Sequence, residues 1–491
     1  MKVLFIYPDI DPYIPNYRGR LHFGLCSISA CLKAVGIETF LVHITTDPAR
    51  EELLKKVRRI SPDIVAFSSG TNMFSYATRY SLWIKEEFKL PIICGGIHPT
   101  IDPQSAIIQE GFDMVCVGEG EEAMRELCMA LKEDRDITNI RNIWVKNNGK
   151  VYQNPVRPLI NNLDDLPFYD WELFNIKDLE DTQEDIGVYL ASRGCPFNCS
   201  YCVNHQIKKI YSPQRVTTRF QSVERVIKEI KTLLNRYPFI KYLIFHDDTL
   251  MKNKRWFKDF CMEYRSQIGL SYMCNTRPER INDDTASLLK ISGCRRVWIG
   301  IESGNEEIRR TVLKRPISTK RIKNAFEILN RHGIPTHTFN MVGIPYEDSG
   351  KILETIKLNS EIGSTGMQVT IFYPYPHTEL YELCKKEGFL TNQKACDYRT
   401  TSVLSQPNIS DSQIRFFARY FNLVVKLYRI LSKSGNQKMV DFTDRLLTSK
   451  VFPYKLLAYT YEVIFSILKY LYVSLIRRFY KRKKYQFGAI Q

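Results

Sequence analysis

The chain has 491 residues, 44% hydrophobic and 25% charged, which suits two or three folded globular domains. Its 13 cysteines are mostly scattered singly, so we expect no disulfide framework. The apolar run in residues 1–8 is too short for a signal peptide, so we expect the protein to lie in the reducing cytoplasm. The net charge of +17 favours nucleic acid, an anionic membrane surface or an anionic substrate as partner.

Residues 1–140 alternate short apolar runs, rich in Val and Ile, with helical patterns. Such runs are typical of buried strands, and strand–helix alternation predicts a parallel sheet with helices on both faces. We therefore expect a doubly wound, Rossmann-like domain. The expected strands are Val3–Tyr7, Thr39–Ile44, Ile64–Ser68, Ile92–Cys94 and Met114–Val117, and the expected helices lie near 23–35, 50–60, 74–88 and 121–132.

Residues 141–182 interrupt the alternation. The sequence Asn147-Asn148-Gly149 is a hairpin-turn signal between two short strands. The polar stretch 162–167 then has the composition of a linker. We expect this segment to connect two domains.

From residue 183 to residue 400 the alternation resumes with six strand–helix units. Six such units in series predict a partial parallel barrel, in which chemistry lies at the carboxyl ends of the strands. The expected strands are Gly187–Ala191, Tyr242–His246, Leu270–Asn275, Val297–Ile301, Thr336–Met341 and Gln368–Phe372, and the expected helices lie near 222–236, 254–266, 283–292, 318–332 and 348–362.

Residues 401–491 contain helical patterns only. An aromatic-rich helical pattern at 411–432 is broken at Ser434-Gly435-Asn436. The stretch Leu456–Ile476 is mostly apolar, with its charges on one narrow stripe, and six Arg and Lys residues follow within eight positions. Those charges disfavour a membrane-spanning helix, which leaves two interpretations: docking on an anionic membrane surface, or packing against the barrel.

Three cysteines directly after the first barrel strand are the sharpest signal in the chain. Cys195, Cys199 and Cys202 have the spacing Cys-x3-Cys-x2-Cys. Thiolates are soft ligands that suit iron–sulfur clusters or zinc. A structural zinc site needs a fourth ligand, for which His205 is the nearest candidate. A cubane cluster needs only these three cysteines when its fourth iron binds another molecule.

This spacing, with Tyr201 before the last cysteine, resembles the signature of the radical S-adenosylmethionine (SAM) superfamily. The resemblance implies a [4Fe-4S] cluster held by Cys195, Cys199 and Cys202, whose open iron binds SAM. Reductive cleavage of SAM then yields a 5′-deoxyadenosyl radical. It also implies that polar groups at the carboxyl ends of the barrel strands contact SAM.

The resemblance extends to several of those strand ends. The SAM-contacting residues that it implies are Tyr201, Asp247, Asp248, Arg277, Glu302, Ser303, Gly343 and Pro345. An alternative for Asp248 and Ser303 is that they cap the helices that follow. The sequence leaves open whether Arg277 and Glu302 act on substrate, on SAM or only in packing.

Glycine-containing loops follow strands three to five of the N-terminal domain, where a large flat ligand can approach the backbone. This pattern resembles the cobalamin-binding domain that precedes the radical SAM core in one large subgroup, and the resemblance covers residues 1–400. The Asp-x-His-x-x-Gly cobalt-ligand motif is absent, so the lower cobalt ligand stays unassigned. The predicted cobalamin contacts are Ser68, Ser69, Thr71, Gly95, Gly96, His98, Gly118 and Glu119, with His98 alternatively a turn residue.

The fold implied is therefore α/β, with a cobalamin-binding-type domain at 1–140, a hairpin-containing linker at 141–182, a partial (β/α)6 radical SAM barrel at 183–400 and a helical region at 401–491. The implied activity is methylation of an unactivated carbon of a lipid-like or other small molecule through methylcobalamin. An electron donor such as flavodoxin or ferredoxin is the implied protein partner, and nucleic acid is disfavoured because no separate RNA-binding module is visible. The alternatives are a non-methylating radical SAM enzyme (cyclisation, rearrangement or oxidation) and a non-catalytic cobalamin or redox sensor.

Overall fold

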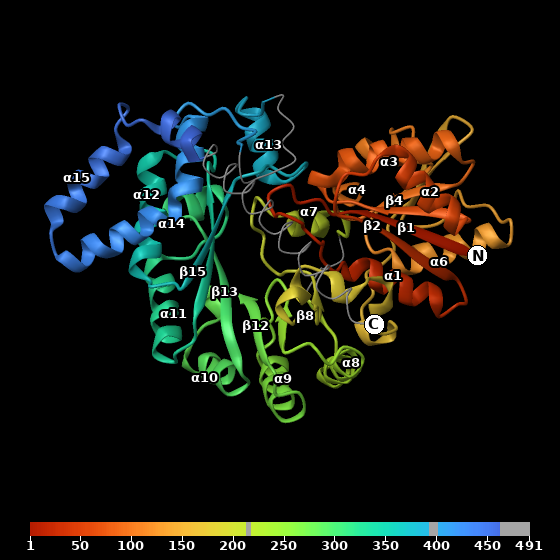
Figure 1. The fold of residues 1–491 in the computed structure, drawn as a ribbon, viewed down its shortest axis with the longest axis horizontal. Helices are drawn as coiled ribbons and strands as arrows, with labels where there is room; N and C mark the ends of the chain where they lie inside the picture. The colour runs from red at the N-terminus through yellow and green to blue at the C-terminus, as the bar shows by residue number, and fades with distance from the viewer. Residues whose placement is uncertain (213–217, 392–400, 462–491) are drawn as a thin grey trace, which may run out of the picture.

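The computed structural model describes residues 1–212, 218–391 and 401–461, and it contains two large sheets that lie side by side (Figure 1). The N-terminal sheet has seven strands in the order β2-β1-β3-β4-β5-β6-β7. Its first five strands are parallel, as the alternation predicts. The strands are β1 (Lys2–Pro8), β2 (Glu38–Ile44), β3 (Ile64–Ser68), β4 (Ile92–Gly95), β5 (Met114–Cys116), β6 (Ile143–Asn147) and β7 (Lys150–Gln153).

The predicted hairpin is present, and it belongs to the N-terminal sheet. Strand β6 pairs antiparallel with β5, so the hairpin extends the sheet by two strands. Asn148 and Gly149 both have positive φ, as a tight two-residue hairpin turn requires. The pairing satisfies the backbone of β5, which would otherwise be an open sheet edge.

Helices cover both faces of this sheet, as Figure 1 shows. The four longer helices match the predicted positions, because their apolar residues recur at helical spacing and pack on the strands. Two short helices after β4 have no helical periodicity in the sequence. The helices are α1 (Phe23–Lys33), α2 (Arg50–Ile60), α3 (Phe74–Glu87), α4 (Ile97–Ile101), α5 (Pro103–Ile107) and α6 (Glu121–Lys132).

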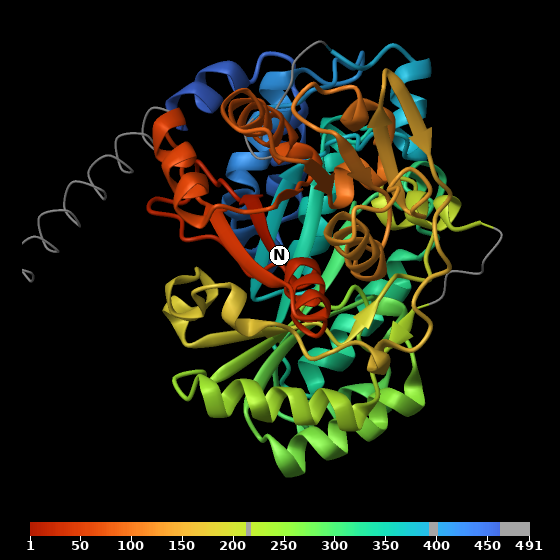
Figure 2. The same ribbon diagram turned by 90° about the vertical axis from the view of Figure 1, so that its right-hand side faces the viewer.

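The segment between the two sheets is packed rather than extended. Tyr169, Trp171 and Phe174 are buried and belong to one apolar core with residues of both sheets, such as Phe5 and Phe245. Figure 2 shows this segment, in yellow, between the red N-terminal strands and the green barrel strands. The aromatic side chains therefore hold the two halves of the molecule together.

The second sheet has six parallel strands in the order β15-β14-β13-β12-β11-β8, an open half-barrel with the predicted strand sequence. A two-stranded antiparallel pair, β9 (Ser192–Arg193) and β10 (Arg219–Phe220), lies beside its first strand. The six strands are β8 (Ile186–Tyr189), β11 (Tyr242–Phe245), β12 (Ser271–Thr276), β13 (Cys294–Glu302), β14 (Thr336–Val342) and β15 (Gly366–Ile371).

Most helices of the half-barrel begin at a side-chain cap. Ser222, Asn253, Asn282, Ser318 and Asp348 each accept a hydrogen bond from the backbone N–H three residues on, which is the usual N-cap geometry. These caps place each helix start directly after a strand-end loop. The helices are α7 (Val203–Ile210), α8 (Val223–Arg236), α9 (Lys254–Gln267), α10 (Asp283–Ile291), α11 (Thr319–Arg331), α12 (Ser349–Glu361) and α13 (Glu379–Lys386).

Two C-terminal helices, α14 (Asp411–Ser434) and α15 (Gln437–Thr448), form a hairpin over the last strands of the half-barrel (Figure 1). Helix α14 ends at Gly435, whose φ of +66° fits the predicted break. Within the described residues, no helix combines the length and the apolarity needed to cross a bilayer. Most of the predicted apolar segment 456–476, and the whole basic run after it, lie outside the described residues.

Candidate active site

The three motif cysteines lie in the loop between β9 and α7, at the carboxyl end of the half-barrel. Ser200 fixes this loop, because its N–H donates to the carbonyl of Leu313 (3.1 Å), its hydroxyl to that of Val312 (2.6 Å), and its carbonyl accepts from the N–H of Leu380 (3.0 Å). The Lys208 ammonium donates to the Phe197 carbonyl (2.6 Å). The loop is therefore anchored from several sides.

The donor set of this loop suits an iron–sulfur cluster. Burial raises the pKa of the Cys202 thiol to about 12, and Cys199 and Cys195 add to the effect, so the thiols lie within electrostatic reach of one another. No three His, Cys, Asp or Glu side chains of the described chain already have the geometry of a metal site. Metal binding replaces the protons of these thiols, because the thiolate is the form that binds a metal. His205, the zinc alternative's fourth ligand, lies 3.7 Å from Glu379 instead.

A cavity of about 390 Å³ separates the cysteine loop from the N-terminal sheet. Its walls come from both halves of the chain and meet at the carboxyl ends of both sheets, where the two sets of predicted residues were expected. The lining includes Ser68, Gly95, Gly96, Gly118 and Glu119 on one side, and Gly194, Cys195, Asn204, Lys208, Asp248 and His246 on the other.

The deep end of this cavity is apolar and enters the N-terminal domain between the sheet and two helices. Its lining there is Phe5, Leu25, Ile28, Ala66, Ile93, Cys116 and Met124. Two glycines that line the cavity leave no room for a side chain: a Cβ at Gly120 would lie 2.8 Å from Ile28, and one at Gly118 would collide with the Tyr211 hydroxyl. The space therefore suits a ligand that places an apolar or aromatic part between the sheet and these helices, as the benzimidazole of cobalamin could.

Three predicted contacts in the N-terminal domain do not line the cavity: Ser69, Thr71 and His98. Ser69 donates its hydroxyl to the Gly70 carbonyl. His98 is buried within α4, not in a turn, and its two ring nitrogens lie near the hydroxyls of Thr71 (3.4 Å) and Ser105 (3.1 Å). The short helix α4 turns this histidine into the interior, so it packs against α3 instead of facing the ligand space.

His22 lines the cavity although it was not among the predicted contacts. It caps α1, where its Nδ1 accepts from the N–H of Leu25 (3.1 Å), and its Nε2 lies 3.2 Å from the Ser68 hydroxyl. Burial lowers the pKa of His22 to about 4, so the ring is neutral near pH 7. Histidine is not a preferred N-cap, which is why its position in the sequence carried no signal.

The two aspartates after β11 have different surroundings. Asp247 is fully buried and accepts hydrogen bonds from the backbone N–H of Ala191 and the hydroxyl of Ser192, just before the cysteine loop. Burial raises the pKa of Asp247 to about 7. Asp248 instead lines the cavity and accepts from the Asn204 amide (2.9 Å). Asp247 therefore positions the loop, whereas Asp248 faces the ligand space.

Arg277 and Glu302 lie beside the cysteines. One Arg277 nitrogen is 3.5 Å from the Cys199 sulfur, and its guanidinium lies 3.7 Å from the centre of the Phe197 ring. Glu302 has a φ of +68°, a strained conformation for a non-glycine residue, and such strain is common at functional sites. Burial raises the pKa of Glu302, while Arg315, 3.9 Å away, and Tyr201 oppose the shift. Arg315 had no signal in the sequence.

The remaining predicted residues lie at the ends of β13 and β14. Ser303 is fully buried, and its hydroxyl accepts from the N–H of Asn305 (3.3 Å). The next helix is capped by Asn305, whose side chain accepts from the N–H of Ile308 (2.9 Å), so Ser303 is not the cap. Gly343 has a φ of +79°, and a Cβ there would lie 3.1 Å from Ile414 of α14. Pro345 is buried beside it. None of these three lines the cavity next to the N-terminal sheet.

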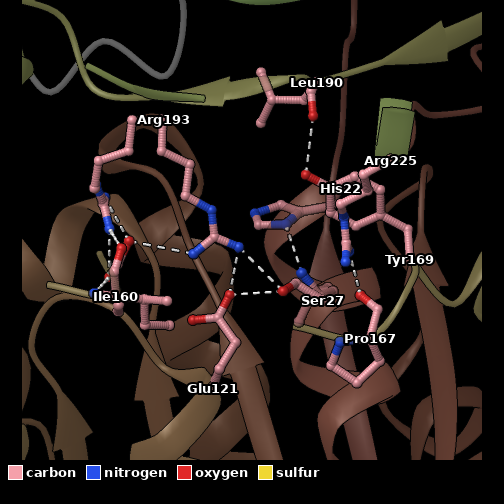
Figure 3. A network of polar contacts seen from close by, with 12 residues as sticks. His22, Ser27, Glu121, Ile160, Pro167, Tyr169, Leu190, Arg193 and Arg225 are labelled. Carbon is pink, nitrogen blue, oxygen red and sulfur yellow. Dashed lines mark hydrogen bonds and ion pairs between the residues drawn. The ribbon is translucent and has the colours of Figure 1, made fainter. Parts of the chain in front are cut away.

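A buried ion-pair network joins the two sides of the cavity (Figure 3). Arg193, two positions before Cys195, contacts Glu121 at 2.6 Å and Glu119 at 3.2 Å, and Arg219 contacts Glu119 at 2.7 Å. Burial by itself raises the pKa of Glu121, but Arg193 more than offsets this and the pKa is lowered. Glu121 is the first residue of α6 and Glu119 lies in the loop just before it, so the network fixes the N-terminal domain to the cysteine loop.

Two family models match the chain in the order in which these parts occur. The B12 binding domain matches residues 19–128, and the radical SAM superfamily matches residues 189–358. Among curated relatives, an uncharacterized methyltransferase, PH0819, of Pyrococcus horikoshii is 28% identical over 84% of this chain and 90% of its own length. An anaerobic magnesium-protoporphyrin IX monomethyl ester cyclase of Rubrivivax gelatinosus is 25% identical over 78% of this chain and 70% of its own.

Solved structures share the whole arrangement. The radical SAM methyltransferase TsrM from Kitasatospora setae, with cobalamin and a [4Fe-4S] cluster bound, has a TM-score of 0.64 at 16% identity, over 80% of this chain and 76% of its own. The cobalamin-dependent SAM radical enzyme OxsB has a TM-score of 0.67 at 14% identity, over 96% of this chain and 72% of its own. This likeness shows the shared fold, and the two family models together with the cysteine motif show that the chain belongs to the radical SAM superfamily, among the members that carry a B12-binding domain ahead of the radical SAM core.

Proposed function

We propose that this chain is a cobalamin-dependent radical SAM enzyme that methylates an unactivated carbon of a small molecule. The observation that carries the proposal is the shared cavity, which has the N-terminal glycine loops on one wall and Cys195 on the other. A cofactor on each wall would then face the other across one space. The relatives named as a methyltransferase or a methylase support methyl transfer as the outcome.

In this proposal Cys195, Cys199 and Cys202 hold a [4Fe-4S] cluster, and Gly95, Gly96 and Gly118 form the cobalamin cradle. When bound, the cluster, SAM and cobalamin supply the electron-transfer, radical and methyl-transfer chemistry. The protein contributes position and exclusion of water.

Other residues of the site orient these groups. Arg277 donates toward Cys199, and Asp248 presents a carboxylate to the same cavity. An electron donor such as flavodoxin or ferredoxin would supply the reducing electron. The small-molecule substrate in this proposal can be a lipid-like molecule.

The test is anaerobic reconstitution with iron, sulfide and cobalamin, followed by addition of SAM and a strong reductant. We expect both 5′-deoxyadenosine and S-adenosylhomocysteine as products. Cys199→Ala should abolish 5′-deoxyadenosine, whereas Cys261→Ala, which changes a buried cysteine of α9, should not. If protein that holds its cluster forms neither of these two products, the proposal is contradicted.

A second candidate is a radical SAM enzyme of the same build that does not methylate. It is favoured by the similarity to the magnesium-protoporphyrin ester cyclase of Rubrivivax gelatinosus. The same assay separates the two candidates, because the second forms 5′-deoxyadenosine without S-adenosylhomocysteine.

A further inference from the structure

Exposed apolar side chains concentrate on the C-terminal hairpin and on the residues that follow it. Of the fourteen large apolar side chains that are exposed in the described residues, nine lie between positions 423 and 459. Isolated exposed apolar residues are normal, but a concentration of this kind marks an interaction surface. The nine are Leu423, Leu427, Ile430, Met439, Phe442, Leu446, Val451, Leu456 and Tyr459.

These side chains form stripes on the two helices. On α14 the exposed residues are spaced by four and three positions (Leu423, Leu427, Ile430), and on α15 by three and four (Met439, Phe442, Leu446). Both spacings place three side chains on one face of a helix. Ile430 is 66% exposed and Phe442 67%. Each helix therefore presents an apolar face to the outside.

The opposite faces anchor the hairpin to the half-barrel, so the exposed stripes sit on a fixed frame. Phe417, Phe421 and Val425 of α14 are buried in one core with residues of α12 and β15. Asp444 of α15 pairs with Lys357 of α12 and accepts from the Tyr428 hydroxyl. The exposed stripes are thus surplus to the packing of the fold.

Positive charge accompanies the exposed stripes. Residues 411–491 contain 16 Lys and Arg but only 4 acidic residues, so this sixth of the chain carries +12 of the net charge of +17. Exposed cations are interleaved with the apolar stripes at Lys426, Lys433, Lys438, Arg445, Lys450 and Lys455. The sequence continues the same combination beyond the described residues, with an apolar stretch to Ile476 and then six cations within eight positions.

We propose that α14, α15 and the described residues after them, up to position 461, form a docking surface for an anionic lipid membrane. Apolar stripes can enter the boundary between headgroups and acyl chains, while neighbouring Lys and Arg side chains bind anionic headgroups. The cores of protein–protein interfaces are instead depleted of Lys, which argues against a second copy of the chain as the occupant. The proposal does not depend on the catalytic activity.

The surface is connected to the active-site end of the half-barrel. Ile414, in the first turn of α14, packs at Gly343 at the end of β14. The Gln406 amide, just before α14, donates to the Gly343 carbonyl (2.9 Å). A membrane docked on the hairpin would therefore lie on an element that also contacts the carboxyl ends of the barrel strands.

The test is co-sedimentation of the full-length protein with vesicles of phosphatidylcholine alone or with about 30% phosphatidylglycerol. We expect binding to the anionic vesicles only, weakened by high salt because surface charge is screened. Ile430→Glu and Phe442→Glu should each weaken binding about tenfold. Met262→Glu, on the exposed face of α9 and 54% exposed, is the matched control and should leave binding unchanged.

Three results would overturn the proposal. One is absence of vesicle binding by the full-length protein. Another is equal binding by the two hairpin variants and the wild type, when melting temperatures show that all are folded. The third is a concentration-dependent dimer that Phe442→Glu dissociates while vesicles have no effect, since the surface would then belong to a second copy.

Discussion

At the scale of single residues, the candidate site depends on buried carboxylates with different partners. Glu121 is paired with an arginine, which lowers its pKa, whereas Asp247 and Glu347 have hydrogen bonds but no strong cation beside them. Burial raises the pKa of Asp247 to about 7 and that of Glu347 to about 8. The same residue class thus serves as a fixed charge in one place and as a titratable hydrogen-bonding group in another.

Glu347 allows a test of this difference through stability. It is fully buried and accepts from the N–H groups of Gly343 (2.8 Å) and Ile344 (3.2 Å). An acid whose pKa is raised by folding contributes stability below its ordinary pKa, about 4.5, and loses that contribution as the pH rises through about 8. Glu347→Gln keeps the acceptor and cannot ionise.

We therefore expect the melting temperature of the wild type to fall relative to Glu347→Gln between pH 5 and pH 9. The corresponding loss in the free energy of unfolding should be on the order of 1 kcal/mol or more, because one pKa unit corresponds to ~1.4 kcal/mol. Thermal denaturation of both proteins across this pH range is the measurement. Parallel pH profiles of the two proteins would contradict the expectation.

At the scale of elements, the loops after the N-terminal strands determine the width of the cavity. The β5–α6 loop passes close to α7, and the N–H of Glu119 donates to the Tyr211 hydroxyl (2.9 Å). Gly118 makes this approach possible, because it has a φ of +89° and carries no Cβ. One glycine therefore sets the distance between the two walls.

Gly118→Ala should destabilise the protein and weaken cobalamin binding, because the new Cβ would collide with the Tyr211 hydroxyl as well as strain the backbone. Gly149→Ala is a matched control: Gly149 also has positive φ (+74°), but its Cβ would have no neighbour within 4 Å. We expect about 1–3 kcal/mol from strain at either position and a further loss only at Gly118. Melting temperature and cobalamin titration by absorbance measure both effects, and equal effects of the two variants would refute the collision argument.

At the scale of the whole molecule, two contacts hold the halves together: the aromatic core around Trp171 and the ion pairs of Arg193 and Arg219. Arg193 and Arg219 lie on the two strands that flank the cysteine loop and α7. A displacement of the N-terminal wall of the cavity would therefore shift Arg193, which lies two positions before Cys195.

Arg193→Met should cost about 3–5 kcal/mol, because it leaves Glu121 buried and unpaired at 3% exposure. Arg58→Met is the comparison, because Arg58 pairs with Glu87 on the surface and exposed pairs contribute only about 0–1 kcal/mol. We also expect weaker cobalamin binding for Arg193→Met. Thermal unfolding and absorbance titration test both effects. A loss of stability no larger than that of Arg58→Met would show that the network does not hold the halves together.

Local patterns in the sequence were enough to predict the strands of both sheets and the longer helices of the body. Apolar periodicity is a property of neighbouring residues, and burial in the folded protein preserves it. The Cys-x3-Cys-x2-Cys motif is local in the same way, so the predicted cluster loop needed no tertiary information. The break at Gly435 was also predictable, because glycine at a helix end favours the left-handed conformation.

Only the tertiary structure decided which polar residues face the cavity. His98 turns into the interior because it lies in the short helix α4, and His22 faces the cavity because it caps α1; apolar periodicity reports neither position. The pairing of Arg193 with Glu121 joins residues 72 positions apart, and the addition of β6 to the N-terminal sheet depends on an open edge at β5. These features follow from the meeting of distant segments, for which a single sequence has no local pattern.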